Sequence, residues 1–219
     1  MGTKTSRSPE PHSRQARIAE MRKAEKTRDR RNKFIAIGAS VAIVAGLVGF
    51  GTYVLLKADE KAEQKAEQAK APIGEEKTWD AAKLGRNHVE TQVKYEMKPP
   101  VGGDHNPRWM NCSGDVYTAP IPEVNAVHSL EHGAVWITYN AKAPKADVEK
   151  LAEKVKKTQY TLMSPVEDQA GTIMLSAWGK QVTVKDASDP RVDQFFSKYV
   201  QGPQTPEPGA ACTGGVSSQ

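Results

Sequence analysis

The chain has 219 residues, enough for one domain with additional segments, and its net charge is +5. Residues 1–33 hold eleven lysines and arginines against four acids, an excess of seven, so the rest of the chain carries a net charge of −2. The basic balance belongs to one end of the chain, and the composition argues against a nucleic-acid-binding protein.

Residues 1–33 form a basic cytoplasmic tail in our interpretation, with almost no large apolar side chains. Its charge and low hydrophobicity are typical of a disordered, solvated segment. The alternative is a functional one, in which the basic side chains are attracted to anionic lipid headgroups at the membrane surface.

The segment Phe34–Leu56 has no charged residue over its 23 positions. A helix of this length crosses a hydrocarbon core of about 30 Å, whereas the apolar core of a signal peptide has about 7–15 residues. We therefore predict an uncleaved, single-pass transmembrane helix. Because the basic excess lies on its N-terminal side, we expect a cytoplasmic N-terminus and a C-terminal domain outside the plasma membrane.

Residues 57–72 repeat alanine, glutamate, lysine and glutamine, a composition that favours helix. Lys57, Lys61 and Lys65 share one helix column, however, and like charges at that spacing repel each other mildly. We predict a partly helical stalk that holds the next domain away from the membrane.

An extracytoplasmic domain is expected over residues 73–202, because strand and helix patterns succeed one another there. The expected strands are His88–Tyr95, Gly133–Tyr139, Tyr160–Val166, Thr172–Trp178 and Gln181–Val184, and the expected helices are Lys145–Thr158 and a segment that opens at Asp189-Pro190 and carries Val192, Phe195, Phe196 and Tyr199. This order predicts an α+β fold with two helices packed on a small antiparallel sheet. Residues 203–219 show no periodicity and are typical of a flexible C-terminal tail.

The stretch Lys98–His132 is rich in proline and glycine and predicts a long loop that presents polar groups. It contains three of the five histidines of the chain, one of its two cysteines and a tryptophan. We therefore look for a functional site in this stretch.

Several motifs of the domain resemble a bacterial family known as domain of unknown function 3105. They are HVETQVKY from His88, PPVGGDH from Pro99, PRWMNC from Pro107, GDVYTAPIPEVNAVHSLEHGAVWITY from Gly114 and SAWGK from Ser176, over roughly residues 87–200. In the family pattern Trp-x-x-Cys-Gly-x-Tyr, two residues separate the cysteine from the tyrosine. Here four residues, Ser113–Val116, separate Cys112 from Tyr117, so this segment is longer than in the family pattern. The resemblance implies a single-pass, membrane-anchored protein of a kind common in actinobacteria, and it implies no reaction.

Histidines of the central stretch are candidate metal ligands. His128 and His132 are four residues apart and would share one face of a helix or of a strand. With His105 and Cys112 they offer three imidazoles and a thiolate, which suit zinc or copper. The alternative is structural, because histidines beside irregular loops often hydrogen-bond unpaired backbone carbonyls.

Three further residues belong to the same candidate surface. They are Trp109, Met110 and Glu131. The thioether of Met110 is a soft ligand that would suit copper.

Two enzymatic functions are alternatives to a binding role. His128-Ser129-Leu130-Glu131-His132 matches the His-x-x-Glu-His arrangement of zinc peptidases, in which the glutamate activates water. That chemistry needs a helix, and the prolines before the motif and the strand after it leave room for about one turn. A nucleophilic pair of Cys112 and His128 is the other alternative, and no local signature of a cysteine enzyme accompanies it.

Cys112 and Cys212 both lie on the side that we place outside the cytoplasm, where disulfides persist. A cysteine in an otherwise structureless tail makes physical sense if it pins the tail to the domain. We predict a disulfide between the two, with free thiols and a bond from Cys112 to a metal ion as the alternatives.

No strong catalytic motif is present, so the sequence favours a non-enzymatic accessory or binding module of the cell envelope. Its partners would be the membrane itself and an envelope protein. The alternative function is a domain that binds copper or zinc through the histidines of the central stretch, and a hydrolase is the remote alternative.

Overall fold

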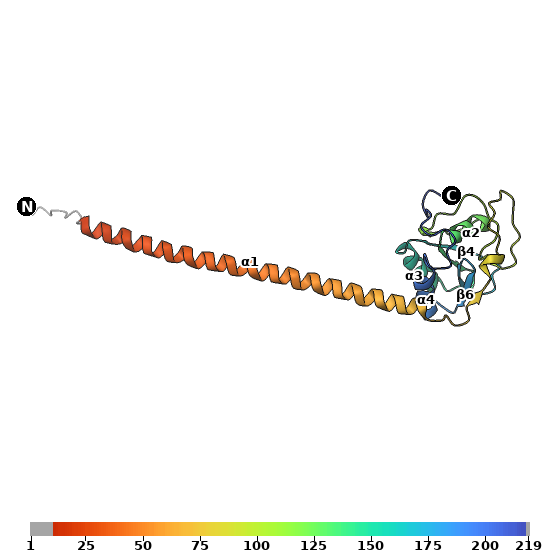
Figure 1. The fold of residues 1–219 in the computed structure, drawn as a ribbon, viewed down its shortest axis with the longest axis horizontal. Coiled ribbons are helices and arrows are strands. Elements are labelled where there is room, and N and C mark those ends of the chain that lie inside the picture. Colours follow the sequence, from red (N-terminus) through yellow and green to blue (C-terminus); the bar gives the residue numbers. More distant parts are fainter. Residues whose placement is uncertain (1–10, 218–219) are drawn as a thin grey trace, which may run out of the picture. The chain divides into compact units, whose positions relative to one another are not determined.

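The computed structural model describes residues 11–217 (Figure 1). Its first element is α1, one uninterrupted helix of 60 residues, Pro11–Lys70 (Figure 1). A part of this helix, within Arg14–Lys61, is long and apolar enough to cross a membrane, and it contains the span expected at Phe34–Leu56. Such a helix near the N-terminus suits a membrane anchor or a signal sequence.

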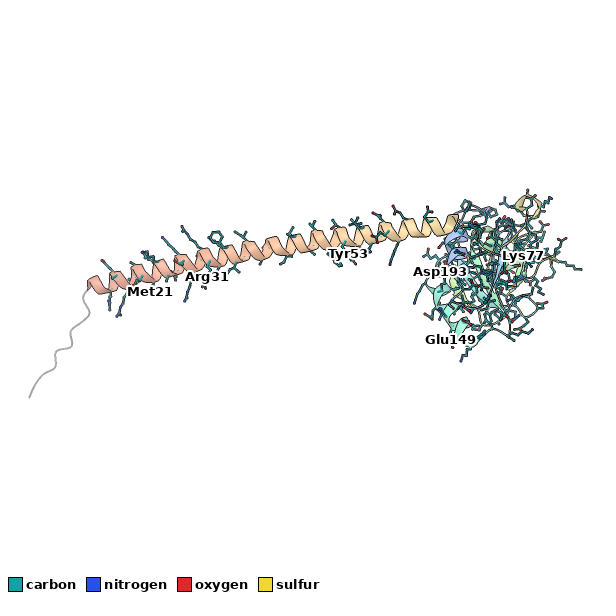
Figure 2. The ribbon with its side chains drawn as sticks, turned by 90° about the horizontal axis from the view of Figure 1, so that it is seen from below. Met21, Arg31, Tyr53, Lys77, Glu149 and Asp193 are labelled. Atoms are coloured by element: carbon teal, nitrogen blue, oxygen red, sulfur yellow. A yellow bond between two sulfur atoms is a disulfide. The ribbon has the colours of Figure 1, made fainter. Side chains whose placement is uncertain are left out.

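The described side chains of α1 project outward around the helix, as Figure 2 shows for Met21, Arg31 and Tyr53. The large apolar ones among them are exposed, with Phe34 at 74% and Leu47 at 66% of their surface. Exposed apolar surface of this extent is unfavourable in water and favourable in lipid, which agrees with a membrane-spanning role.

The basic segment and the stalk are both helical where the structure describes them. The sequence indicated a disordered tail over residues 1–33, but the helix already begins at Pro11, and residues 1–10 lie outside the described part. The stalk continues the helix to Lys70. Repulsion between like charges four residues apart costs only a few tenths of a kcal/mol, so the high helix propensity of alanine, lysine, arginine and glutamate prevails.

The domain that follows α1 has an α+β fold, as predicted. Within the described residues its elements are β1 (Lys77–Thr78), a short 3-10 helix (Ala81–Lys83), β2 (Ser113–Val116), α2 (Glu123–Glu131), β3 (Val135–Tyr139), α3 (Lys145–Lys156), β4 (Thr161–Pro165), β5 (Ile173–Ala177), β6 (Lys180–Val184) and α4 (Pro190–Tyr199). The expected strands from Gly133 onward and the two expected helices are present, with bounds shifted by one to a few residues.

The six strands form one mixed sheet in the order β1-β6-β5-β3-β4-β2. The prediction of an antiparallel sheet was wrong for one half, because β3, β4 and β2 run parallel to one another. The reason is α3, which connects β3 to β4 as a crossover and so returns the chain in the same direction. Strands β1, β6, β5 and β3 are antiparallel, as expected.

The sheet is covered on both faces, because side chains alternate along each strand. In β3, Val135 and Ile137 face a core with α3 and α4, whereas Trp136 faces a second core with α2. Helices α3 and α4 lie side by side (Figure 1), joined by an ion pair from Lys154 Nζ to Asp193 Oδ1 at 2.5 Å.

Helix α2 was not predicted, since we expected a loop with room for about one turn. It has nine residues, and eight of them, Val124–Glu131, are buried. The helix is short and follows two prolines, and this local sequence favours a loop.

The segment His88–Tyr95 was predicted to be a strand, and this was wrong. Only His88 pairs, through an isolated parallel bridge to His105. The alternation in the sequence is nevertheless expressed as burial: Val89, Val93 and Tyr95 are half-buried against the domain, while the residues between them are exposed. Alternating burial does not require a neighbouring strand.

The described part of the C-terminal segment, residues 203–217, lies against the domain, although its composition is typical of a flexible tail. The predicted disulfide between Cys112 and Cys212 is present, and Cys112 N also donates to Cys212 O at 2.9 Å. Further along, Val216 N donates to Trp109 O at 2.7 Å. The pinned segment therefore becomes part of the surroundings of α2.

Candidate metal centre

Helix α2 divides its buried residues between two environments. Ala126, Val127 and Leu130 belong to the core between α2 and the sheet. His128 and Glu131 are polar and buried, and His132 follows as the C-cap residue. Because residues three and four apart are neighbours on a helix surface, these three side chains lie on one face, turned away from the sheet.

The loop before α2 covers this polar face and is bonded to it. Asn106 N donates to Val124 O at 3.1 Å, and Met110 N donates to Asn125 O at 3.1 Å. Ser129 Oγ donates to Met110 O at 2.8 Å. These bonds satisfy backbone groups that irregular structure leaves unpaired, and they hold the loop over the histidines.

A first group of donor atoms comes from His88, His105, His128 and Glu131, and all of these atoms lie within 4.8 Å of one another. The ring of His128 lies 4.7 Å from that of His88 and 4.8 Å from that of His105, between centroids. The side chain of His88 is 46% exposed, whereas His105, His128 and Glu131 are buried. The group is thus enclosed by the protein except at His88.

The carboxylate of Glu131 is the anionic member of this first group. Its Oε2 atom lies 2.8 Å from His105 Nε2 and 3.7 Å from His88 Nε2. Two ligands of one tetrahedral ion are about 3.4 Å apart when the metal–ligand bonds are about 2.1 Å, and the two separations bracket this value. The other oxygen, Oε1, accepts a hydrogen bond from Arg86 Nε at 2.8 Å.

Three buried imidazoles share one hydrogen-bonding pattern. The Nδ1 atoms of His105, His128 and His132 each lie 2.7 Å from a backbone carbonyl oxygen, that of Gly103, Asn106 and Ala211 respectively. A carbonyl only accepts, so each Nδ1 carries the proton and donates it. The Nε2 atoms are left to face the cluster, which is the arrangement that orients metal-binding histidines in proteins.

Electrostatics favour the metal-binding protonation states of His128, His132 and Glu131 at neutral pH. Burial lowers the pKa of His128 to about 4, an effect that the neighbouring imidazoles reinforce and the bond to Asn106 opposes. Burial likewise lowers the pKa of His132. Burial acts to raise the pKa of Glu131, but hydrogen bonds from His105 and Arg86 outweigh it and bring this pKa to about 2. Neutral imidazoles and an ionised carboxylate are the forms that bind metal ions.

A second group shares one histidine with the first. It consists of His128, His132 and Glu207, whose donor atoms also lie within 4.8 Å of one another. His132 Nε2 lies 3.8 Å from Glu207 Oε2, and the rings of His128 and His132 are 4.5 Å apart between centroids. Glu207 comes from the C-terminal segment, where its N–H donates to Glu131 O at 3.1 Å.

The predicted trio of histidines is therefore divided between two groups: His105 belongs to the first, His132 to the second and His128 to both. The sulfur of Cys112 is bonded to Cys212, so it is not a thiolate and is neither a ligand nor a nucleophile. The pairing of Cys112 with His128 as a catalytic dyad is excluded for the same reason.

The remaining candidates take different places. Met110 is fully buried in the core between α2 and the sheet and is not part of a surface. Trp109 packs on the imidazoles, with its ring 4.9 Å from that of His132 and 5.7 Å from that of His128. Glu131 is buried at the centre of the first group instead of lying on a surface.

Sequence reasoning missed His88 and Glu207. His88 was read as the first residue of a strand, and Glu207 lies in a segment without any periodic pattern. The histidine count was the available signal for His88, because four of the five histidines fall within the domain. For Glu207 the only signal was its position five residues before Cys212, because the predicted disulfide would bring this segment close to α2.

The helical form of α2 meets one requirement of the zinc-peptidase arrangement, yet the carboxylate is not free for that role. Both oxygens of Glu131 are engaged, one by Arg86 and one by His105. A carboxylate with a pKa of about 2 is a weak base, and a general base works best when its pKa is near the working pH. The geometry thus disfavours Glu131 as the general base of a peptidase.

Comparison with known proteins identifies the family. No curated protein and no solved structure is significantly similar to the chain. A family model described as "Protein of unknown function (DUF3105)" matches residues 88–214, more than half of the chain. The matched region begins at His88 and includes both groups of candidate ligands and both cysteines. The chain belongs to the DUF3105 family.

Proposed function

We propose that this protein is a membrane-anchored module that binds a transition-metal ion, with His88, His105, His128 and Glu131 as the ligands. The observation that carries the proposal is the convergence of these four donors while the Nδ1 atoms of the buried histidines are held by carbonyls. A histidine that only satisfies a backbone carbonyl uses one ring nitrogen for that hydrogen bond. A purely structural role of these histidines therefore does not explain why their second ring nitrogens gather around a buried carboxylate.

The contact between His105 and Glu131 supports a cation at this place. His105 faces oxygen acceptors on both sides, Gly103 O at 2.7 Å and Glu131 Oε2 at 2.8 Å. Glu131 is ionised, since its pKa is about 2. A lone pair on Nε2 would repel the carboxylate at this distance, so Nε2 carries a proton in the metal-free protein, and a bound metal ion would take the place of that proton.

The ligand types indicate copper or zinc. Imidazole suits zinc, copper, iron and nickel, whereas magnesium and calcium prefer oxygen ligands throughout. The bonded cystine leaves no thiolate for the site, which disfavours the soft cuprous ion and favours zinc or cupric copper. Arg86 neutralises the negative charge of Glu131 in part and fixes its orientation, the part that second-shell residues play at metal sites.

The site would lie outside the cytoplasm. A disulfide persists in oxidising compartments, and the basic residues before the apolar span favour a cytoplasmic N-terminus. We therefore place the domain on the outer side of the plasma membrane, as a non-enzymatic module that holds or delivers a metal ion to a partner in the envelope.

Metal analysis of the full chain in lipid nanodiscs tests the proposal. After removal of metal with a chelator and dialysis against zinc or copper, the wild-type protein should retain metal tightly. His88→Ala should weaken retention without unfolding the domain, because His88 is the exposed ligand. Loss of a hydrogen bond to a ligand typically costs 10–100-fold in affinity, so loss of the ligand itself should cost at least about tenfold.

A matched pair of variants on α2 separates ligation from a general loss of charge. Glu131→Gln removes the anionic ligand, whereas Glu123→Gln removes a carboxylate of the same helix that pairs with Lys98 at 3.9 Å and lies outside both groups. Glu131→Gln should lower the affinity and Glu123→Gln should leave it unchanged. A wild-type protein that retains no metal, or equal affinities for both variants, would refute the proposed function.

A further inference from the structure

We infer that the centre is a single-ion site with two alternative positions that share His128, so that a bound ion can pass from one to the other. The inference rests on the proposed metal binding and deepens it. The first position is formed by His88, His105, His128 and Glu131, and the second by His128, His132 and Glu207. The ligand is a divalent transition-metal ion such as zinc or cupric copper.

The shared residue limits the number of ions. His128 donates Nδ1–H to Asn106 O at 2.7 Å, so only Nε2 has a lone pair to give. One imidazole lone pair binds one metal ion. Two ions therefore cannot occupy both positions with their ligand sets complete, and full coordination at the first position leaves the second with two protein ligands.

The two positions differ in strength. The first offers three imidazoles and a carboxylate that is buried and oriented by Arg86. The second offers two imidazoles and a carboxylate that is 43% exposed. More ligands and less water favour the first position, so it should hold the ion at equilibrium while the second serves as the position of exchange.

The second position is nonetheless built by specific contacts. His132 is oriented by its bond to Ala211 O at 2.7 Å, and Glu207 by the bond from its N–H to Glu131 O at 3.1 Å. Ala211 and Glu207 lie on the C-terminal segment that Cys212 fixes to Cys112. Trp109 packs against His132 with 4.9 Å between ring centroids and limits access of water on that side.

Passage between the positions needs little movement. The rings of His128 and His132 are 4.5 Å apart between centroids, and those of His128 and His88 are 4.7 Å apart. An ion that keeps His128 as a ligand can exchange His88, His105 and Glu131 for His132 and Glu207 without entering bulk water. The side chain of Glu207 is partly exposed and can accept the ion from, or present it to, an external partner.

Titration with cobalt(II), a spectroscopic probe for zinc sites, tests the inference on the full chain in nanodiscs. The wild-type protein should saturate at one ion per chain. The double variant His88→Ala/Glu131→Gln keeps only two imidazoles at the first position, against three ligands at the second. It should still bind one ion, at least about tenfold more weakly and with a changed visible spectrum, because the ion then occupies the second position. Circular dichroism checks that the variants are folded; the side chains of His88 and Glu207 are partly exposed, and glutamine keeps the size and shape of the buried Glu131.

The decisive comparison is the effect of Glu207→Gln in two backgrounds. In the wild-type protein it should change the affinity by less than about twofold, since the ion occupies the first position. In the His88→Ala/Glu131→Gln protein it should weaken binding by about tenfold or more, because Glu207 has become a ligand there. This dependence on background is the signature of alternative positions.

Each other outcome has a definite meaning. Two ions per wild-type chain, no binding by His88→Ala/Glu131→Gln, or an equal effect of Glu207→Gln in both backgrounds would overturn the two-position inference while leaving metal binding intact. Absence of binding by the wild-type chain would instead overturn the proposed function itself.

Discussion

Acidification from pH 7 to pH 4 should destabilise the metal-free domain, and His128 should account for much of the loss. In the folded protein burial lowers the pKa of His128 to about 4, from about 6.5 for an unperturbed histidine. The unfolded chain therefore takes up this proton first as the pH falls. The stabilisation is fully present above pH 6.5 and is lost as the pH falls towards 4.

The magnitude follows from the difference between the two pKa values. One pKa unit corresponds to 1.36 kcal/mol, so the shift of His128 is worth at most about 3 kcal/mol at pH 4. For a domain of about 150 residues, 1 kcal/mol shifts the melting temperature by about 2–4 °C. The contribution of His128 should then be a decrease of about 6–12 °C between pH 7 and pH 4.

Calorimetry of wild-type protein and His128→Asn, both with chelator, checks this value. The amide of asparagine keeps an N–H donor near Asn106 O but does not titrate. The groups that face His128, namely His88, His105, His132 and Glu131, are the same in both proteins, so their own titration is common to both. Equal decreases in melting temperature for the two proteins would refute the assignment to His128.

Three further predictions concern the frame around the site. Replacement of both Cys112 and Cys212 by serine should destabilise the domain by up to about 4.7 kcal/mol, the chain-entropy value for a loop of about 100 residues, and a change below 1 kcal/mol in urea unfolding would contradict it. Protease added to intact cells with an opened wall should remove the C-terminal domain and spare a tag at Met1, and a protected C-terminus would reverse the proposed orientation. A Gly/Ser linker of equal length in place of residues 57–72 should leave the melting temperature of the domain unchanged, and a decrease of several degrees would mean that the stalk packs on the domain.

The sequence determined the features that depend on local pattern or composition. An uncharged run of 23 residues is enough to identify a candidate membrane span. Strands β3 to β6 and helices α3 and α4 have β-branched runs, turn signals or apolar residues at helical spacing, so their existence could be predicted within a few residues. The pairing of Cys112 with Cys212 followed from the count of cysteines and the predicted compartment.

The tertiary structure decided the parts that form the candidate site. Helix α2 is enclosed by the sheet on one side and by the loop on the other, so its polar face is buried like its apolar face, and only the tertiary structure brings the loop there. The parallel pairing of β2 with β4 joins segments far apart in the chain, and no local pattern encodes which strands become neighbours.

The membership of the metal centre was decided in the same way. His88 reaches His105 by an isolated bridge between two loops, and Glu207 reaches His132 because a disulfide fixes a segment without secondary structure. Sequence alone could name His105, His128 and His132 as candidates, because residue type suffices for that. Which donors share a point in space depends on contacts across 26 to 79 residues, and only the folded chain sets those contacts.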